Sequence, residues 1–139
     1  ISGFCCTAGV PPNTVENIYG IAKIYETYVG RKQFQPNDII FEQLQHLGNE
    51  FGATTGRKRQ CNWLNLKRLI RAVHVNGVTH LIINKCDIIN ELNVYKIYDE
   101  SDNLLTFSSF EEMKSYLINI FQNIHFVKDV IFSFSKTQV

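Results

Sequence analysis

The stretch GATTGRKRQCNWL, residues 52–64, places glycines, hydroxyls and basic side chains next to one another. Gly52 and Gly56 allow the backbone to turn sharply and to expose its N–H groups. The threonine hydroxyls add short donors, and Arg57 and Arg59 add planar guanidinium groups that suit carboxylates and phosphates. The stretch therefore predicts a loop that binds a small ligand with several negative charges. The alternative is a solvated turn that is basic without a ligand.

A second polar cluster, Asn84-Lys85-Cys86-Asp87, directly follows the apolar run Leu81-Ile82-Ile83. A short continuous apolar run is typical of a strand covered on both faces, and ligands of open α/β sheets gather at the carboxyl ends of such strands. A carboxylate at that position can accept hydrogen bonds from the N1–H and amino group of guanine, while a lysine stem lies across the base. The cluster fits the NKxD guanine pocket of GTP-binding proteins, and it also fits an ordinary polar strand end.

Hydrophobic spacing and capping residues predict the elements that position these two clusters. Residues 1–13 are expected to form a loop, because glycine and proline punctuate them. Helices are predicted over residues 15–28, 38–47, 66–76 and 108–123, the third of them capped by Asn65. Strands are predicted at residues 81–83, 92–99, 103–107 and 127–135, the second and third joined by a turn at residues 101–103.

These elements indicate an α/β protein, in which part of a mostly parallel central sheet is flanked by helices and followed by a small C-terminal α+β portion. A chain of 139 residues fits one domain or a piece of a larger one. With 45% apolar and 19% charged residues, the chain is able to bury a core and is not compositionally disordered.

The overall charge is close to neutral, since 14 Lys and Arg residues are balanced by 13 Asp and Glu residues, so any basic site must be local. We therefore expect no nucleic-acid partner, and no apolar run reaches the roughly 20 residues of a membrane span. The four cysteines and four histidines lack the paired spacings of a zinc site. Such cysteines are typical of small buried side chains in a reducing compartment, so a cytoplasmic location is expected.

The run NEFGATTGRKRQCNWLNLKRLIRAVHVNGVTHLIINKCDI, residues 49–88, closely resembles adenylosuccinate synthetase. The segments GVPP and YGIAKIYETYVG precede it in the same order as in that family, and the similarity extends from about Gly3 to Asp99. The family consists of GTP-dependent ligases that join IMP to L-aspartate. The resemblance implies a fold related to the P-loop NTPases, with residues 1–139 forming the C-terminal part of a synthetase-like domain.

The resemblance also implies roles for individual residues. The loop that closes over aspartate would consist of Ala53, Thr54, Thr55, Gly56, Arg57, Lys58 and Arg59. Within it, Thr55 and Arg57 would hold the aspartate carboxylates, and Arg57 would also bind the ribose of IMP. Arg59 would be shared between aspartate and GTP.

The guanine of GTP would be bound by two segments. Lys85, Cys86 and Asp87 match the family's guanine-recognition segment, with Asp87 accepting hydrogen bonds from the base edge. The tail VKDVIFSFSKTQ, residues 127–138, resembles the segment whose three-residue turn lies against the guanine. That match implies that Ser133, Phe134 and Ser135 bind GTP.

The implied reaction has two steps: GTP phosphorylates O6 of IMP, and the aspartate amine then displaces the phosphate. Mg²⁺ would serve as the cofactor, and the enzyme would be a homodimer. The family's glycine-rich GDEGKGK loop, catalytic aspartate and catalytic histidine have no counterpart in these residues. We therefore expect the chain to correspond to the carboxy-terminal portion of a longer enzyme. Alone it would be inactive and would lack catalytic residues and Mg²⁺ ligands.

Two alternatives remain at this point. One is the related viral-type ligase, which makes 2-aminoadenylosuccinate from a deoxyguanylate. The other is a non-catalytic module that binds GTP or nucleic acid, with residues 57–59, Lys67, Arg68 and Arg71 as a phosphate-binding patch. The near-neutral charge and the lack of aromatic residues among these basic ones argue against the second alternative.

Overall fold

The structure is a computed structural model that describes residues 2–135. Residue 1 and residues 136–139 of the predicted unit 1–139 lie outside the described residues. They include the end of the segment 127–138. The helices are α1 (Ser2–Ala8), α2 (Ile40–Leu47), α3 (Leu66–Asn76), α4 (Cys86–Leu92) and α5 (Phe110–Gln122), with a short 3-10 helix at Pro12–Thr14. The strands are β1 (Tyr19–Lys23), β2 (Tyr25–Tyr28), β3 (Gln60–Asn65), β4 (His80–Asn84), β5 (Lys96–Tyr98), β6 (Leu104–Thr106) and β7 (Asp129–Phe132).

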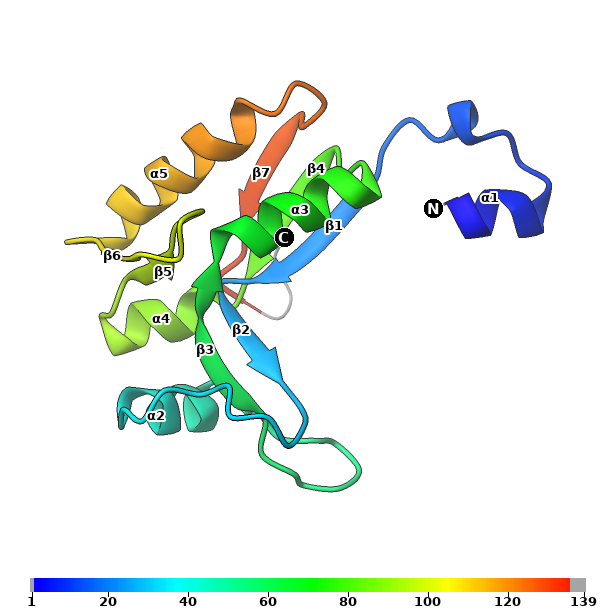
Figure 1. The fold of residues 1–139 in the computed structure, drawn as a ribbon. Helices are drawn as coiled ribbons and strands as arrows, with labels where there is room; N and C mark the ends of the chain where they lie inside the picture. The colour runs from blue at the N-terminus through cyan, green and yellow to red at the C-terminus, as the bar shows by residue number, and fades with distance from the viewer. Residues whose placement is uncertain (1, 136–139) are drawn as a thin grey trace.

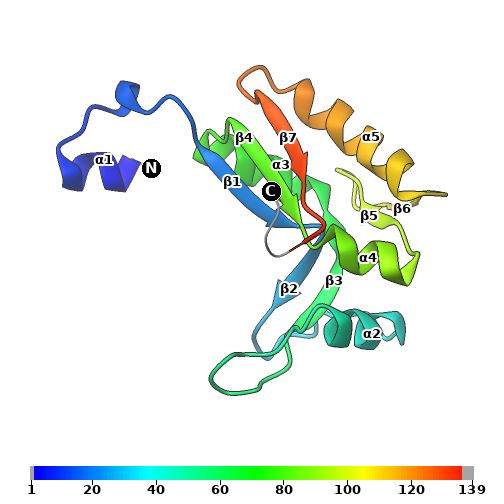
Figure 2. The same ribbon diagram turned by 180° about the vertical axis from the view of Figure 1, so that it is seen from behind.

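A parallel sheet with the strand order β1-β4-β7 forms the centre of the molecule (Figure 1). Helix α3 covers one face of β1 and β4, and α5 runs beside β7 (Figures 1 and 2). The run Leu81, Ile82 and Ile83 is buried in the middle strand. The predicted α/β class and its buried parallel strand are therefore confirmed.

A second sheet has the order β2-β3-β5-β6. Strands β2 and β3 are antiparallel, β3 and β5 are parallel, and β5 and β6 form an antiparallel pair. The predicted turn joins β5 to β6, and the Asp99 carboxylate stabilises it by accepting hydrogen bonds from the N–H groups of Ser101 and Asn103 at 2.8 Å. The basic loop (residues 52–59) follows α2 and leads into the start of β3, at the end of this sheet that lies far from the parallel sheet (Figure 1).

The helix predicted over residues 15–28 is wrong, because this segment forms β1 and β2. Apolar residues recur there at helical spacing, but β-branched and aromatic side chains also suit a strand. Pairing with β4 along the whole of β1 decides between the two. Gly20 was the local signal against a helix: a Cβ there would lie 2.7 Å from the side chain of Val78, so glycine permits this close packing.

Three other parts of the chain differ from the prediction. Residues 1–13 contain helix α1 rather than only a loop, and in both views α1 stands apart from the two sheets (Figures 1 and 2). Strand β3 and helix α4 were not predicted at all. The β3 sequence QCNWLN alternates between polar and apolar residues from Gln60 to Trp63, which is a typical strand signal, whereas α4 has only 7 residues and no clear periodic pattern.

The other predicted helices are confirmed. The Asn65 side chain caps α3 by accepting a hydrogen bond from the Arg68 N–H at 3.0 Å. Ser109 caps α5, since its hydroxyl accepts a hydrogen bond from the Glu112 N–H at 3.2 Å. No helix among residues 2–135 combines the length and apolar character that crossing a membrane requires.

Candidate functional site

The basic loop is a hairpin with a defined base and an exposed tip. Phe51 and Lys58 form an antiparallel bridge at its base. The Gly52 N–H donates to the Arg57 carbonyl at 2.9 Å, and the Gly56 N–H donates to the Gly52 carbonyl at 2.8 Å. Gly56 has a φ of +63°, the left-handed region that favours glycine. Residues 53–58 are exposed, so the tip presents its donors to solvent.

Arg57 is free to bind a ligand. Its side chain makes no hydrogen bond or ion pair with any of residues 2–135. Its backbone N–H donates to the Thr55 hydroxyl at 3.4 Å, and both residues lie on the exposed tip. A free planar guanidinium of this kind can bind a carboxylate with two parallel hydrogen bonds.

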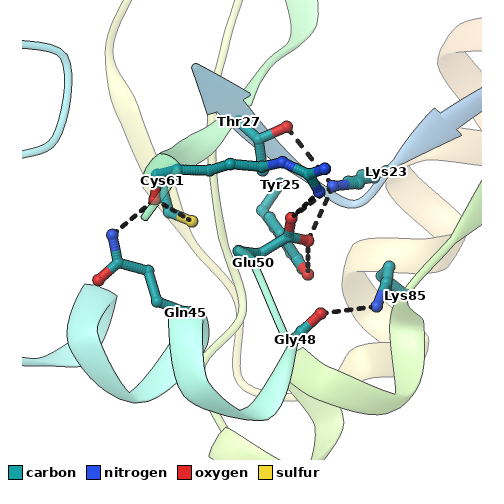
Figure 3. A network of polar contacts seen from close by, with 9 residues as sticks. Lys23, Tyr25, Thr27, Gln45, Gly48, Glu50, Cys61 and Lys85 are labelled. Atoms are coloured by element: carbon teal, nitrogen blue, oxygen red, sulfur yellow. Dashed lines mark hydrogen bonds and ion pairs between the residues drawn. The ribbon is translucent and has the colours of Figure 1, made fainter. Parts of the chain in front are cut away.

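Arg59 lies at the base of the loop and contacts the buried carboxylate of Glu50, which Figure 3 shows among its other partners. Its Nη1 donates to Oε2 of Glu50 at 3.0 Å. The Glu50 side chain is only 1% exposed, and it also accepts hydrogen bonds from Lys23 and Tyr25. Burial alone would raise the pKa of the Glu50 carboxyl, but these three hydrogen bonds outweigh burial and hold its pKa below the usual range.

The second predicted segment begins at the carboxyl end of β4. Lys85 has a φ of +64°, a strained conformation for a residue with a side chain, and such strain is common at functional sites. Its Nζ donates to the Gly48 carbonyl at the end of α2, at 2.8 Å (Figure 3). Asp87 lies exposed in the first turn of α4. Among residues 2–135, the Asn84 Oδ1 is the one buried side-chain oxygen or nitrogen without a hydrogen-bond partner.

The structure brings the predicted tail residues beside this strand end. The Ser133 N–H donates to the Ile83 carbonyl at 2.9 Å, and the Cys86 N–H donates to the Ser133 carbonyl at 3.2 Å. Lys85, Asp87 and Ser135 line one cavity of about 330 Å³, which we call the strand-end cavity. Its other lining residues are Leu47, Gly48, Asn49, Asn84, Ile88 and Glu91. The two segments predicted to bind guanine therefore meet at one cavity.

Cys86 and Phe134 are placed differently from the other predicted residues. The Cys86 thiol is fully buried, donates to the Ile83 carbonyl at 3.3 Å, and has its pKa raised to about 12 by burial. Its contribution to a ligand site is therefore limited to its backbone. The Phe134 ring is 43% exposed and lies edge-on to Phe110, with 4.9 Å between the ring centroids.

A larger cavity of about 470 Å³ between β2 and α3 contains none of the residues predicted to bind aspartate or GTP. Its charged residues include Glu26 and Arg68, which form an ion pair with each other at 2.9 Å. The strand-end cavity is smaller, but it combines a lysine, an exposed carboxylate and an unpartnered amide oxygen. Convergent polar groups of this kind are typical of a ligand site, so the chemistry favours the strand-end cavity.

Comparison with known proteins identifies the family. A sequence model of adenylosuccinate synthetase matches residues 1–120. The chain belongs to the adenylosuccinate synthetase family. An adenylosuccinate synthetase from Yarrowia lipolytica is 42% identical over 99 residues, which are 70% of this chain and 23% of the relative. One from Thermodesulfovibrio yellowstonii is 46% identical over 100 residues, 70% of this chain and 24% of the relative.

The chain thus spans about a quarter of the length of the curated synthetases that it matches. A solved structure, the fully ligated adenylosuccinate synthetase from Plasmodium falciparum, superposes with a TM-score of 0.73 at 21% sequence identity. The match covers 94% of this chain and 40% of that one. At this identity the superposition establishes a shared fold.

Within this synthetase fold, Glu50, Lys23 and Tyr25 are residues that sequence reasoning missed. Glu50 belongs to the NEFG segment of the resemblance, and a carboxylate immediately before a strongly basic loop was an available signal. Lys23 and Tyr25 are far from the loop in sequence, and no local pattern connects them to it. Among the described residues, no three His, Cys, Asp or Glu side chains gather as ligands of a metal ion would.

Proposed function

We propose that this chain is part of an enzyme that joins IMP and L-aspartate to form adenylosuccinate, with GTP as co-substrate. The chain supplies the aspartate loop and the guanine site of that enzyme. The observation that carries the proposal is the unpaired Arg57 guanidinium on an exposed hairpin, in a chain that also places Lys85 and Asp87 in one cavity. The family membership supports the same assignment.

Aspartate requires a site for two carboxylates that leaves its amine free. In the proposed complex, the Arg57 guanidinium binds one carboxylate with two parallel hydrogen bonds. Thr55 lies on the same exposed tip, and its hydroxyl adds a short donor. Arg59 uses Nη1 for Glu50, and its remaining N–H groups are available to a ligand. Fixing both carboxylates orients the amine for attack and removes much of the entropic barrier.

Guanine would occupy the strand-end cavity. The exposed Asp87 carboxylate can accept hydrogen bonds from N1–H and the amino group of the base. Lys85 already spans the cavity, since its Nζ reaches the Gly48 carbonyl, and its stem offers an apolar surface to the base plane. Ser135 closes the same cavity from the tail.

The proposal also includes a homodimeric, Mg²⁺-dependent enzyme of the cytoplasm, as the resemblance to the family implies. All four cysteines are free thiols, which fits a reducing compartment. Because the described residues hold no cluster of metal ligands, we assign no step of the reaction to a metal bound by them. Their contribution is to bind and orient aspartate and the guanine base.

The nucleic-acid alternative is disfavoured by the pairing of its basic residues. Arg68 forms an ion pair with Glu26 at 2.9 Å, and Lys67 lies 3.8 Å from the Asp102 carboxylate. These contacts reduce the positive charge that a phosphate backbone would require.

The function is tested by substituting Arg57→Leu in the full-length protein that carries this chain, with steady-state kinetics for each substrate. Loss of a charge-assisted hydrogen-bonded pair is expected to raise the KM for aspartate by about 10- to 100-fold and to change the KM for GTP little. Arg71→Leu is the matched control, because Arg71 is exposed on α3, away from the loop.

An equal rise in both KM values would contradict the assignment of the loop to aspartate. Offering IMP and a deoxyguanylate in parallel separates the proposed substrate from that of the viral-type ligase. Turnover with the deoxyguanylate alone would exclude IMP as the substrate.

A further inference from the structure

We propose that Glu50 is a positioning residue for the basic loop and that it acts by aiming the Arg59 guanidinium at the ligand. The inference rests on the proposed function, which assigns Arg59 to a ligand, and it adds a residue that does not itself touch substrate. It follows from the geometry around a single buried carboxylate.

The hydrogen-bonding capacity of the Glu50 carboxylate is fully used (Figure 3). Lys23 Nζ donates to both oxygens at 2.8 Å, the Tyr25 hydroxyl donates to Oε1 at 2.8 Å, and Arg59 Nη1 donates to Oε2 at 3.0 Å. A carboxylate offers about four lone-pair sites, and four donor contacts fill them. Glu50 therefore has no free site for abstracting a proton from substrate, which leaves a positioning role.

The three donors come from three separate segments of the fold. Lys23 ends β1 in the parallel sheet, Tyr25 begins β2 in the second sheet, and Arg59 is the last loop residue before β3. Glu50 lies between α2 and the loop. One carboxylate thus ties the base of the loop to both sheets, so the loop cannot shift its base without breaking buried hydrogen bonds.

Arg59 is held by its backbone as well as by its side chain. Its N–H donates to the Glu50 carbonyl at 2.9 Å, and its carbonyl accepts a hydrogen bond from Gln45 Nε2 at 2.6 Å. Because both the N–H and the carbonyl of Arg59 are fixed, the hydrogen bond to the Glu50 carboxylate determines the direction in which the Arg59 guanidinium points. The Arg59 side chain remains 36% exposed, so the N–H groups that Glu50 does not use stay accessible.

The negative charge of Glu50 is what allows Lys23 and Arg59 to share one small volume. Both cations lie within 3.0 Å of the same carboxylate. Without that charge they would repel each other, and the more exposed Arg59 side chain would turn toward solvent. Arg59 would then have to be ordered by the ligand at the moment of binding, at a cost in affinity.

The test compares Glu50→Gln with the matched control Glu26→Gln in the full-length protein. Glu26 is a half-buried carboxylate that is also paired with an arginine, but its partner Arg68 lies on α3. Glu50→Gln is expected to raise the KM for aspartate by about 10- to 100-fold, by analogy with the residues that orient the side chains of metal sites. Glu26→Gln is expected to leave it unchanged.

A double-mutant cycle shows whether Glu50 acts through Arg59. In an Arg59→Gln background, Glu50→Gln should add no further rise in the KM for aspartate. Additive effects would overturn the proposal, and so would a Glu50→Gln variant that raises the KM for IMP as much as the KM for aspartate, together with a lowered Tm. Tyr25→Phe removes one donor to Glu50 and is the milder variant if Glu50→Gln fails to fold. It should shift the aspartate KM in the same direction, and an unchanged KM would count against the proposal.

Amide hydrogen exchange separates failure of this inference from failure of the proposed function. If the wild-type protein shows no aspartate-dependent turnover, the proposed function fails, and exchange in residues 51–59 still reports on Glu50. Faster exchange in Glu50→Gln than in Glu26→Gln would support the positioning role. Equal exchange in the two variants would overturn it.

Discussion

Asp87 is the residue that we propose to determine which nucleotide is bound. Its carboxylate lies exposed in the first turn of α4 and lines the strand-end cavity, where it can accept two hydrogen bonds from a guanine edge. Replacing it with asparagine keeps the shape but exchanges one acceptor for a donor. The substitution therefore tests the hydrogen bonds to the base without changing the volume of the side chain.

We expect Asp87→Asn to lower the preference for GTP over a nucleotide without the 2-amino group by about 10- to 100-fold in kcat/KM, since hydrogen bonds to a charged acceptor are lost. Glu91→Gln is the control, because Glu91 lines the same cavity one turn further along α4. Competition kinetics with the two nucleotides measures the ratio. Unchanged discrimination in Asp87→Asn would remove Asp87 from base recognition.

Among the secondary-structure elements, α5 depends on its first turn. The Ser109 hydroxyl accepts a hydrogen bond from the Glu112 N–H, and the Glu112 carboxylate accepts hydrogen bonds from both the N–H and the hydroxyl of Ser108. These bonds lower the pKa of the Glu112 carboxyl, so it is ionised at neutral pH. Such reciprocal contacts satisfy N–H groups that the helix itself leaves unpaired.

Ser109→Ala is expected to lower the free energy of unfolding by about 1 kcal/mol, because the N-cap acceptor is removed. Ser115→Ala is the control in the same helix, since Ser115 is exposed in the middle of α5 and alanine favours a helix interior. Urea unfolding followed by circular dichroism compares the two. A Ser109→Ala midpoint equal to that of Ser115→Ala would show that the cap contributes nothing.

At the scale of the whole molecule, the loop and the strand-end cavity are joined through residues 48–50. Lys85 bonds to the Gly48 carbonyl at one end of this segment, and Arg59 bonds to Glu50 at the other. Asn49 between them has a φ of +51° and lines the cavity. The two predicted sites are therefore parts of one connected structure.

The buried carboxylates give the whole protein a testable dependence on pH. The folded pKa of Glu50 is lowered, so its stabilisation is present above the unfolded pKa of about 4.3 and is lost as pH falls through the folded value. Burial raises the folded pKa of Glu26 despite its pairing with Arg68. The contribution of Glu26 to the free energy of unfolding therefore falls as the pH rises, opposite to that of Glu50. We expect Glu50→Gln to flatten the rise of stability with pH in the acidic range and Glu26→Gln to steepen it.

Urea unfolding of both variants across acidic and neutral pH measures these slopes. Parallel curves for wild type and Glu50→Gln would show that Glu50 titrates alike in the folded and unfolded chain. Such a result would contradict a network that stabilises its ionised form.

Short-range information in the sequence was enough for much of the fold. Caps such as Asn65 and Ser109, the turn at residues 101–103 and the continuous apolar run before Asn84 all depend on neighbours within a few positions. For the same reason, the residues with candidate chemistry could be named in advance. Their types and spacing carry that information before the chain folds.

Only the tertiary structure decided the features that depend on distant partners. Residues 15–28 became strands because β4 pairs with β1, although their spacing also suited a helix. The carboxylate of Glu50 meets Lys23 and Tyr25 only after the two sheets have formed. Residue types and local spacing therefore determined which groups can bind anions and a purine edge. Folding decided that the Glu50 carboxylate fixes the basic groups of the loop, because contacts between distant segments are set by packing.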